Sequence, residues 1–281
     1  MKTRRPVKNV THLAALASLA AYFFIMPGAE AAQSEWLRSE GGDVRIVADS
    51  AGDDGTIPAI LDIRLKPGWK TYWLEPGASG ITPQVTVDAG AGISLSGLRF
   101  PPPRTFDDGV VRYTGYDQSV AFPLALKREK PGDLMLEASV FLGICKDICI
   151  PVQGKLTLAL PQNGVENPLD GARIKAAIAA LPEKPSDDFK LASASFDPAA
   201  KRLRVALTVP ANAGGATPDL FLAGPPGYGF GKPEKITNVD GQVTAEVPVR
   251  VSSKGGALKS GAVLLLARIG GRSMETPLAF D

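Results

Sequence analysis

The chain has 281 residues, an ordinary content of hydrophobic and charged residues, and a formal net charge of +2. This length suits one large or two modest domains with a buried core. The near balance of charge excludes the extended basic surface that nucleic-acid-binding proteins present, so no nucleic-acid partner is expected.

The first 31 residues have the three parts of a secretory signal peptide. Basic residues stand at positions 2, 4, 5 and 8, an apolar run follows from Leu13 to Met26, and the triplet Ala-Glu-Ala at 29–31 is a cleavage motif. The apolar run is shorter than the ~20 residues that a spanning helix needs. We therefore expect cleavage near Ala31, export to the periplasm, and a mature chain with no membrane span and a net charge of about −1.

The single histidine, His12, lies inside this predicted signal peptide. The mature chain would then lack the imidazole base that Ser-His-Asp and Cys-His catalysis require. Ordinary zinc sites with two cysteines also need histidine or further carboxylate ligands. Both kinds of site are excluded in their usual form. Neither a phosphate loop nor a dinucleotide fingerprint occurs, and no bound cofactor is expected.

From residue 32 to about 162 the sequence has short β-type runs separated by glycine and proline turns, which is typical of a β-sandwich. Three longer connections are predicted at 66–80, 100–104 and 105–117, the first and last rich in aromatic residues. In the first, Trp69, Tyr72 and Trp73 can be strand residues over the core or residues that line a site. The expected strands are Val44–Ala48, Ile57–Leu65, Gln84–Val87, Ser119–Leu126, Leu134–Ile144 and Cys149–Leu160.

Residues 163–188 are predicted to form a linker with a short helix. Alanines and the periodic Ile174, Ile178 and Leu181 favour the helix, and Pro182 ends it. Short β-type runs return over 189–281 and predict a second, smaller β-sandwich. Its expected strands are Lys190–Ser195, Arg202–Val209, Asp219–Leu222, Gln242–Val251, Val263–Ile269 and Arg272–Phe280.

The two cysteines, Cys145 and Cys149, flank a charged Lys146-Asp147 pair between two apolar runs, which is the pattern of a β-hairpin. Fully extended, this four-residue step would hold the two Cα atoms roughly 13 Å apart. A disulfide needs about 4.4 to 6.8 Å. The pair can therefore form a disulfide only across a turn.

Three uses of the pair remain open. As a structural staple, so short a ring would contribute only roughly 2 kcal/mol. As a Cu(I) site, two thiolates would suit the ion, although only Met135 and Met274 lie outside the signal peptide to add a thioether. As a redox-active dithiol, a short-range exposed disulfide would exchange readily, with Lys146 favouring a thiolate and Asp147 opposing it.

Residues 36–160 also resemble a known family, the N-terminal periplasmic domain of the disulfide reductase DsbD and of the copper-sensitivity suppressor B proteins. The resemblance rests on L-K-P-G-W-K-T-Y-W-L-E-P-G-A-S-G-I-T-P, F-P-P-P-R-T-F-D-D-G, Y-T-G-Y and G-I-C-K-D-I-C-I-P. It implies an immunoglobulin-like sandwich whose cysteines receive electrons from a membrane-embedded thiol donor and pass them to periplasmic thioredoxin-like proteins. The expected fold is all-β, with two immunoglobulin-like β-sandwich domains joined by a short helical linker.

By position, the resemblance makes Cys145 and Cys149 the catalytic pair, with Cys149 as the cysteine that forms mixed disulfides. It implies a cap loop over them at Phe106, Asp107, Asp108 and Gly109, and a flanking aromatic residue at Tyr72. Lys146 is expected to line the same site. The cap loop should therefore lie over or beside the cysteines.

The expected function is that of a thiol:disulfide oxidoreductase of the protein-disulfide reductase type. DsbD itself spaces its cysteines more widely, so the C-x-x-x-C spacing favours the copper-suppressor branch and a link to copper tolerance. Longer family members continue into a transmembrane conduit and a thioredoxin-like domain, so a separate protein is expected to supply the electrons. The alternative is a non-catalytic binding module, for Cu(I) at Cys145 and Cys149 or for a protein partner, with a structural disulfide.

Overall fold

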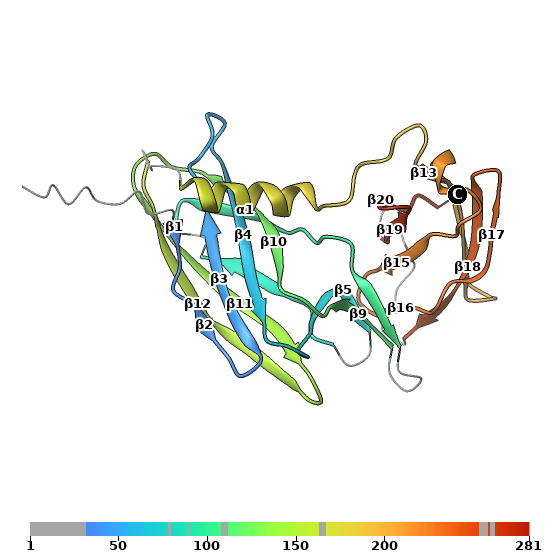
Figure 1. Cartoon of the computed structure of the whole chain (residues 1–281), viewed down its shortest axis with the longest axis horizontal. Helices are drawn as coiled ribbons and strands as arrows, with labels where there is room; N and C mark the ends of the chain where they lie inside the picture. Colours follow the sequence, from blue (N-terminus) through green and yellow to red (C-terminus); the bar gives the residue numbers. More distant parts are fainter. Residues whose placement is uncertain are drawn as a thin grey trace, which may run out of the picture.

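The computed structural model describes residues 32–77, 80–88, 90–107, 112–162, 167–252, 258 and 262–280. The predicted signal peptide with His12, and the cap-loop residues Asp108 and Gly109, lie outside these ranges. The described chain folds into antiparallel β-sheets and one α-helix (Figure 1). The all-β class expected from the sequence is confirmed.

Two sheets enclose the core of the N-terminal part. One has the order β1-β3-β4-β10-β7, with β2 paired to β3, and the other has the order β12-β11-β6. Their inward side chains, such as Leu61, Phe122 and Leu142, are fully buried. The strands are β1 (Ala32–Gln33), β2 (Leu37–Arg38), β3 (Gly42–Ala48), β4 (Thr56–Leu65), β6 (Gln84–Val87), β7 (Ile93–Leu98), β10 (Val120–Arg128), β11 (Leu134–Cys145) and β12 (Cys149–Leu160).

A third sheet, of order β5-β9-β8, corrects the sequence analysis. β5 (Thr71–Gly77), β8 (Arg104–Asp107) and β9 (Arg112–Tyr116) occupy ranges for which long connections are predicted. Gly115 allows β9 to approach β5, because a Cβ at this position would lie 2.2 Å from the carbonyl oxygen of Thr71. Tyr72 and Trp73 are therefore both buried strand residues, and of the two only Trp73 belongs to the core of the sandwich.

The helix α1 (Pro168–Ala179) lies along the outer face of the first sheet (Figure 1). Asn167 caps its N-terminus by accepting a hydrogen bond from the backbone N–H of Leu169. Ile174 is buried against Val47 and Ile60 of β3 and β4. The predicted helix is thus present, and it packs on the N-terminal sheet in addition to leading to the C-terminal strands.

The C-terminal strands form sheets of their own, of order β13-β14-β18-β16, with β17 paired to β18, and β15-β19-β20. Together they enclose a second hydrophobic cluster that includes Phe189, Leu207, Val247 and Leu265. Besides the third sheet, the strands that the sequence analysis does not predict are β1, β2 and β7 in the N-terminal part and β16 and β17 here. The bounds are β13 (Lys190–Asp197), β14 (Arg202–Thr208), β15 (Asp219–Ala223), β16 (Tyr228–Phe230), β17 (Glu234–Val239), β18 (Gln242–Val251), β19 (Leu264–Ile269) and β20 (Arg272–Pro277), with a 3-10 turn at Ala211–Ala213.

The N-terminal and C-terminal parts are in direct contact. The ring of Trp73 on β5 meets the ring of Phe221 on β15 edge to face, with centroids 6.0 Å apart. A guanidinium nitrogen of Arg268 donates to the carbonyl oxygen of Pro103 at 3.0 Å. The third sheet therefore lies between the main sandwich and the C-terminal strands. The division into domains at 32–162 and 189–281 stays a prediction.

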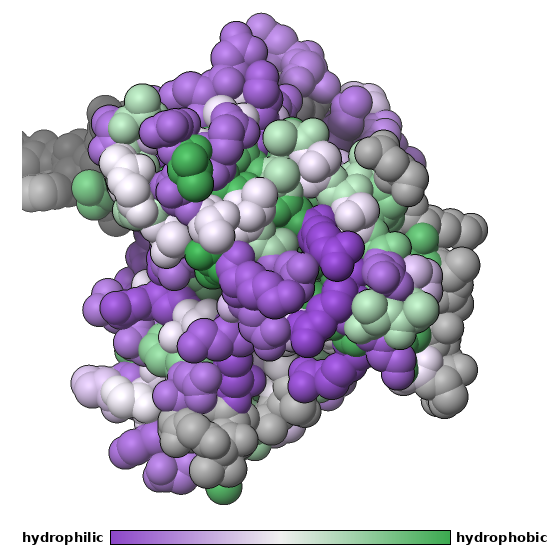
Figure 2. All heavy atoms as spheres, turned by 90° about the vertical axis from the view of Figure 1, so that its right-hand side faces the viewer, coloured by the Kyte–Doolittle hydropathy of each residue, from purple (hydrophilic) through white to green (hydrophobic). Residues whose placement is uncertain are grey.

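Figure 2 shows the molecule from the side of the C-terminal strands. Hydrophilic side chains cover much of this face, and hydrophobic side chains show between them in smaller groups. Within the described ranges, no helix combines the length and the apolar character needed to cross a bilayer.

Candidate functional site

The two cysteines close the tip of the long β11–β12 hairpin. Cys145 ends β11, Cys149 begins β12, and the two face each other as the last cross-strand pair. Their sulfur atoms are bonded and their Cα atoms lie 4.1 Å apart. The backbone N–H of Lys146 donates to the carbonyl oxygen of Ile148 and tightens the turn. The turn thus brings the thiols within bridging distance, as the sequence predicts.

The two ends of the disulfide have different environments. Cys145 is only 2% exposed. Its backbone N–H and carbonyl pair with the carbonyl and N–H of Lys70, both at 2.9 Å, in a short antiparallel bridge. Cys149, in contrast, is exposed at the start of β12. An incoming thiolate therefore has access to the sulfur of Cys149 rather than to that of Cys145.

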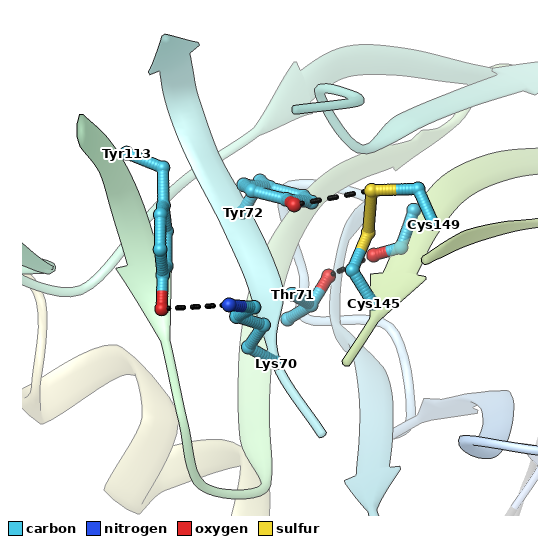
Figure 3. Close-up of a disulfide and its surroundings, with 7 residues drawn as sticks. Lys70, Thr71, Tyr72, Tyr113, Cys145 and Cys149 are labelled. Carbon is cyan, nitrogen blue, oxygen red and sulfur yellow. Dashed lines mark hydrogen bonds between the residues drawn. A yellow bond between two sulfur atoms is a disulfide. The ribbon is translucent and has the colours of Figure 1, made fainter. Parts of the chain in front are cut away.

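Tyr72 is the aromatic residue that reaches the exposed sulfur. Its hydroxyl oxygen lies 3.2 Å from Sγ of Cys149 (Figure 3). Because a disulfide sulfur carries no proton, the hydroxyl is the donor of this hydrogen bond. Burial and the neighbouring Tyr113 raise the pKa of Tyr72. The phenol therefore keeps its proton and stays a donor at neutral pH.

Tyr113 connects this contact to β8 and to Lys70. Its ring meets Tyr72 edge to face at a centroid distance of 5.9 Å and stacks on Phe106 at 4.8 Å. The Lys70 ammonium donates to the Tyr113 hydroxyl at 2.9 Å and lies 4.1 Å from the centre of its ring (Figure 3). A continuous series of aromatic contacts therefore runs from Phe106 through Tyr113 and Tyr72 to Cys149.

The residues of the predicted cap segment separate in space. Phe106 connects to the disulfide side through Tyr113, whereas Asp107 lines a cleft on the opposite face of the third sheet. Asp108 and Gly109 lie outside the described residues. Lys146 is exposed at the hairpin turn. Whether the segment caps the cysteines stays a prediction.

Sequence reasoning missed Lys70, Thr71 and Tyr113. The buried Thr71 hydroxyl donates to the carbonyl oxygen of Gly143 at 2.9 Å, which joins the start of β5 to β11 beside the disulfide. The signal that could have identified these residues is the enrichment of 71–73 and 113–116 in threonine and aromatic residues, which favour strands. Of the residues around the disulfide on β5 and β9, the family resemblance indicates Tyr72 alone.

The described residues offer little for other chemistry at this site. Among them, no group of three or more His, Cys, Asp or Glu side chains could hold a metal ion. The alternative Cu(I) site at Cys145 and Cys149 would rest on the two thiolates alone and stays a prediction. The arrangement can act as a disulfide with one accessible sulfur atom and a hydrogen-bond donor directed at that atom.

These features define a β-sandwich protein with an accessible disulfide at the tip of a hairpin. Residues 43–161 match the family model described as the N-terminal domain of the thiol:disulfide interchange protein DsbD. The resemblance read from the sequence is therefore confirmed over this segment.

A solved structure shares the fold over most of the chain. The crystal structure of the N-terminal periplasmic domain of ScsB from Proteus mirabilis is similar over 90% of this chain and 100% of that chain, with a TM-score of 0.69 and 24% identity. At this identity the likeness establishes the fold alone. No curated protein matches the chain.

Proposed function

We propose that this protein is a periplasmic thiol-disulfide interchange protein. Cys145 and Cys149 carry electrons from a membrane-embedded thiol donor to thioredoxin-like proteins. The observation that carries this proposal is the asymmetry of the disulfide, with Cys145 buried and Cys149 exposed beside the Tyr72 hydroxyl. The match of residues 43–161 to the DsbD N-terminal family supports the same class of chemistry.

Reduction of the protein begins at Cys149. A donor thiolate attacks Sγ of Cys149, the bond between the two sulfurs breaks, and Cys145 leaves as a thiolate that takes up a proton. In the transition state, the negative charge is shared among the attacking sulfur, Sγ of Cys149 and Sγ of Cys145, which lie in line. The Tyr72 hydroxyl, 3.2 Å from Sγ of Cys149, donates to this charge and stabilises the transition state.

The second donor thiol completes the first transfer. It attacks the donor sulfur of the mixed disulfide and releases Cys149 as a thiolate, so two electrons have moved to the Cys145 and Cys149 pair. The Cys149 thiolate then attacks the disulfide of an acceptor, and Cys145 resolves that mixed disulfide. The acceptor leaves reduced, and the bond between Cys145 and Cys149 forms again.

The surface beside Cys149 suits contact with a partner protein. Ile148, at the tip of the hairpin next to Cys149 in the chain, is 71% exposed and offers a partner an apolar contact beside the disulfide. The expected export through a signal peptide cleaved near Ala31 would place this surface in the periplasm. In this proposal the segment Phe106–Gly109 and Lys146 border the site and regulate access to it.

The redox potential of the cysteine pair tests the proposal. The protein is equilibrated with thiol buffers of known potential, and the reduced fraction is read from the mass added by a thiol-alkylating reagent. We expect a value above about −300 mV, the range of disulfides that exchange in cells. A potential far below this value would mark an inert bridge and overturn the proposal. Transfer of electrons from the reduced protein to an oxidised thioredoxin-like protein, abolished in Cys149→Ser, is the direct assay.

A further inference from the structure

A cleft of about 810 Å³ lies between the third sheet and the C-terminal strands. The proposed redox reaction does not use it. Strands β5, β8 and β9 form one wall, and β15, β16, the residues after β16 and the end of β18 form the other. The residues that carry the argument below are Trp73, Arg112, Phe221, Phe230, Lys232 and Arg250.

One face of the third sheet lines the cleft, and its opposite face lies toward the disulfide. On β9, Arg112 and Thr114 line the cleft, while Tyr113 between them contacts Tyr72 on the disulfide side. On β8, Asp107 lines the cleft, while the neighbouring Phe106 stacks on Tyr113. This is the alternation of a β-strand, whose successive side chains point to opposite faces. The cleft is therefore separate from the disulfide site, on the other side of the same strands.

Three cationic side chains around the cleft form no close ion pair with another described residue. Among the described residues, Arg112, Lys232 and Arg250 form no salt bridge within 4.0 Å and no side-chain hydrogen bond. Two carboxylates also line the cleft and offset part of this charge beyond salt-bridge distance, Asp107 near Arg112 and Glu75 near Arg250. Arginines elsewhere in the C-terminal part do have carboxylate partners, namely Arg202, Arg204, Arg268 and Arg272.

Arg112 is partly buried, so the absence of a close carboxylate partner among the described residues is costly for its charge. Burial lowers the pKa of its guanidinium, and the neighbouring charge of Asp107 opposes this shift only in part. The charge of Asp107 compensates only part of the hydration that the partly desolvated guanidinium loses, because it forms no bidentate contact with it. A ligand carboxylate would replace the rest of this hydration, because the five N–H donors of a guanidinium form a fork that matches the two carboxylate oxygens.

The remaining wall of the cleft is apolar. The rings of Trp73 and Phe221 pack edge to face at its base, and Phe230 borders it from β16. The volume lies in the range of about 300 to 1,000 Å³ typical of sites for organic ligands. Polar groups that fix orientation, set against an apolar wall, are the usual composition of such sites.

We infer that this cleft binds an organic carboxylate, with Arg112 and Arg250 as the charged anchors and Phe230 and Phe221 as the apolar contact. The carboxylate belongs either to a small organic acid or to an acidic side chain of a peptide segment. Lys232 adds a further positive charge at the same wall. On the described part of the chain, none of these residues contacts Cys145 or Cys149 directly.

Binding of two probes to the oxidised protein tests this inference. Citrate represents the small acid and a blocked Glu-Glu-Phe-Glu-Glu peptide represents the acidic segment, and both are titrated by calorimetry at low and at physiological salt. We expect at least one probe to bind with a dissociation constant below about 1 mM and to weaken with salt. Binding of citrate alone assigns the site to small acids, binding of the peptide alone to a polypeptide segment, and binding of both to the shared carboxylate chemistry.

Matched variants decide whether the arginines of the cleft are responsible. Arg112→Gln and Arg250→Gln should each weaken binding about tenfold or more, as expected for loss of a charge-assisted bidentate contact. Arg204→Gln is the control, because Arg204 pairs with Glu246 on the surface and does not line the cleft. Each of the two cleft variants tests the inference on its own, so the test can be completed with one variant if the other does not fold. Absence of binding by both probes at about 10 mM, a concentration that would detect even a weak site, overturns the inference, as does binding that both Gln variants leave unchanged.

Discussion

The hydroxyl of Tyr72 lies 3.2 Å from Sγ of Cys149, and two residues earlier in the chain the backbone of Lys70 pairs with Cys145. The start of β5 therefore contacts both halves of the disulfide by different means. Its backbone holds the buried cysteine in place, and its side chain reaches the exposed one. This division of roles allows the hydrogen bond to the reactive sulfur to be removed without disturbing the backbone bridge.

The substitution Tyr72→Phe removes that hydrogen bond alone. One hydrogen bond to a developing negative charge contributes about 1 kcal/mol, so we expect reduction of the disulfide by dithiothreitol to slow about fivefold. The rate is measured by stopped flow under pseudo-first-order conditions. Tyr116→Phe is the control, because the Tyr116 hydroxyl donates to the carbonyl oxygen of Pro101 inside the core. It should lower stability and leave the reduction rate unchanged, and an equal rate for Tyr72→Phe and wild type would contradict the role given to Tyr72.

The difference in exposure between the two cysteines predicts a difference in reactivity. In Cys145→Ser the remaining thiol is the exposed Cys149, and in Cys149→Ser it is Cys145, which is 2% exposed. We expect iodoacetamide to alkylate the first variant about tenfold faster or more at the same pH, because access and thiolate fraction set the rate. Mass spectrometry gives the two rates. Faster alkylation of Cys145 would reverse the assignment of the attacked sulfur.

Lys70 should contribute to stability through Tyr113. The substitution Lys70→Gln removes the hydrogen bond to the Tyr113 hydroxyl and the contact of the ammonium with its ring. Together these interactions contribute about 1 kcal/mol to the free energy of unfolding. Urea denaturation measures the loss. Lys146→Gln is the matched control on the exposed turn and should change stability by less than about 0.5 kcal/mol.

The cysteine hairpin could be predicted closely from the sequence. The expected strands ended at Ile144 and began at Cys149, and the structure extends the first by one residue to Cys145. Both strands are long, and β12 alternates buried and exposed residues, so the pattern has a clear period. The turn at 146–148 then fixes which residues of the two strands face each other.

The third sheet could not be predicted in the same way. Pro76, Gly77 and Gly115 are residues that usually mark turns, and they interrupt the alternation of β5 and β9. Gly115 is a strand residue here because another backbone passes too close for any side chain. The pairing of β5 with β9 is therefore a property of tertiary packing, and it is this pairing that brings Tyr113 to Tyr72.

The sequence of β4 contains a pattern that indicates a covering element on the outer face of the first sheet, where α1 packs. Residues 57–63 form a nearly continuous apolar run, which is typical of a strand covered on both faces. One face of this run packs into the sandwich, and Ile60 on the other face packs under Ile174. The run therefore indicated that some element covers the outside of the sheet, although not that the following helix supplies it.

A pH-dependent contribution to stability is expected from Asp188. Hydrogen bonds from Arg272 and then from Ser186 lower its pKa from 3.8 to about 2. Because the folded-state value is the lower one, this contribution is complete above the ordinary pKa and disappears as the pH falls through about 2. Asp188→Asn should therefore lower the Tm at pH 6, and the difference from wild type should shrink steadily between pH 4 and pH 2.

Thermal unfolding followed by circular dichroism measures this dependence. Asp187→Asn is the control one residue earlier, because its side chain is fully exposed. Its effect on the Tm should stay small over the same range of pH. A difference between Asp188→Asn and wild type that stays constant down to pH 2, or that grows, would exclude the ion pair with Arg272 as its source.

The packing of α1 on the N-terminal sheet gives the last prediction. Ile174 is 2% exposed and contacts Val47 and Ile60, whereas Ile178, one turn later on the same helix, is 46% exposed. Ile174→Ala should leave a cavity beneath the helix and lower the free energy of unfolding by about 3 kcal/mol. Ile178→Ala makes the same chemical change on the exposed face and should cost less than about 1 kcal/mol. Urea denaturation of both variants compares the two sites, and equal losses would mean that α1 is only a connector, since a helix that does not pack has no buried side to weaken.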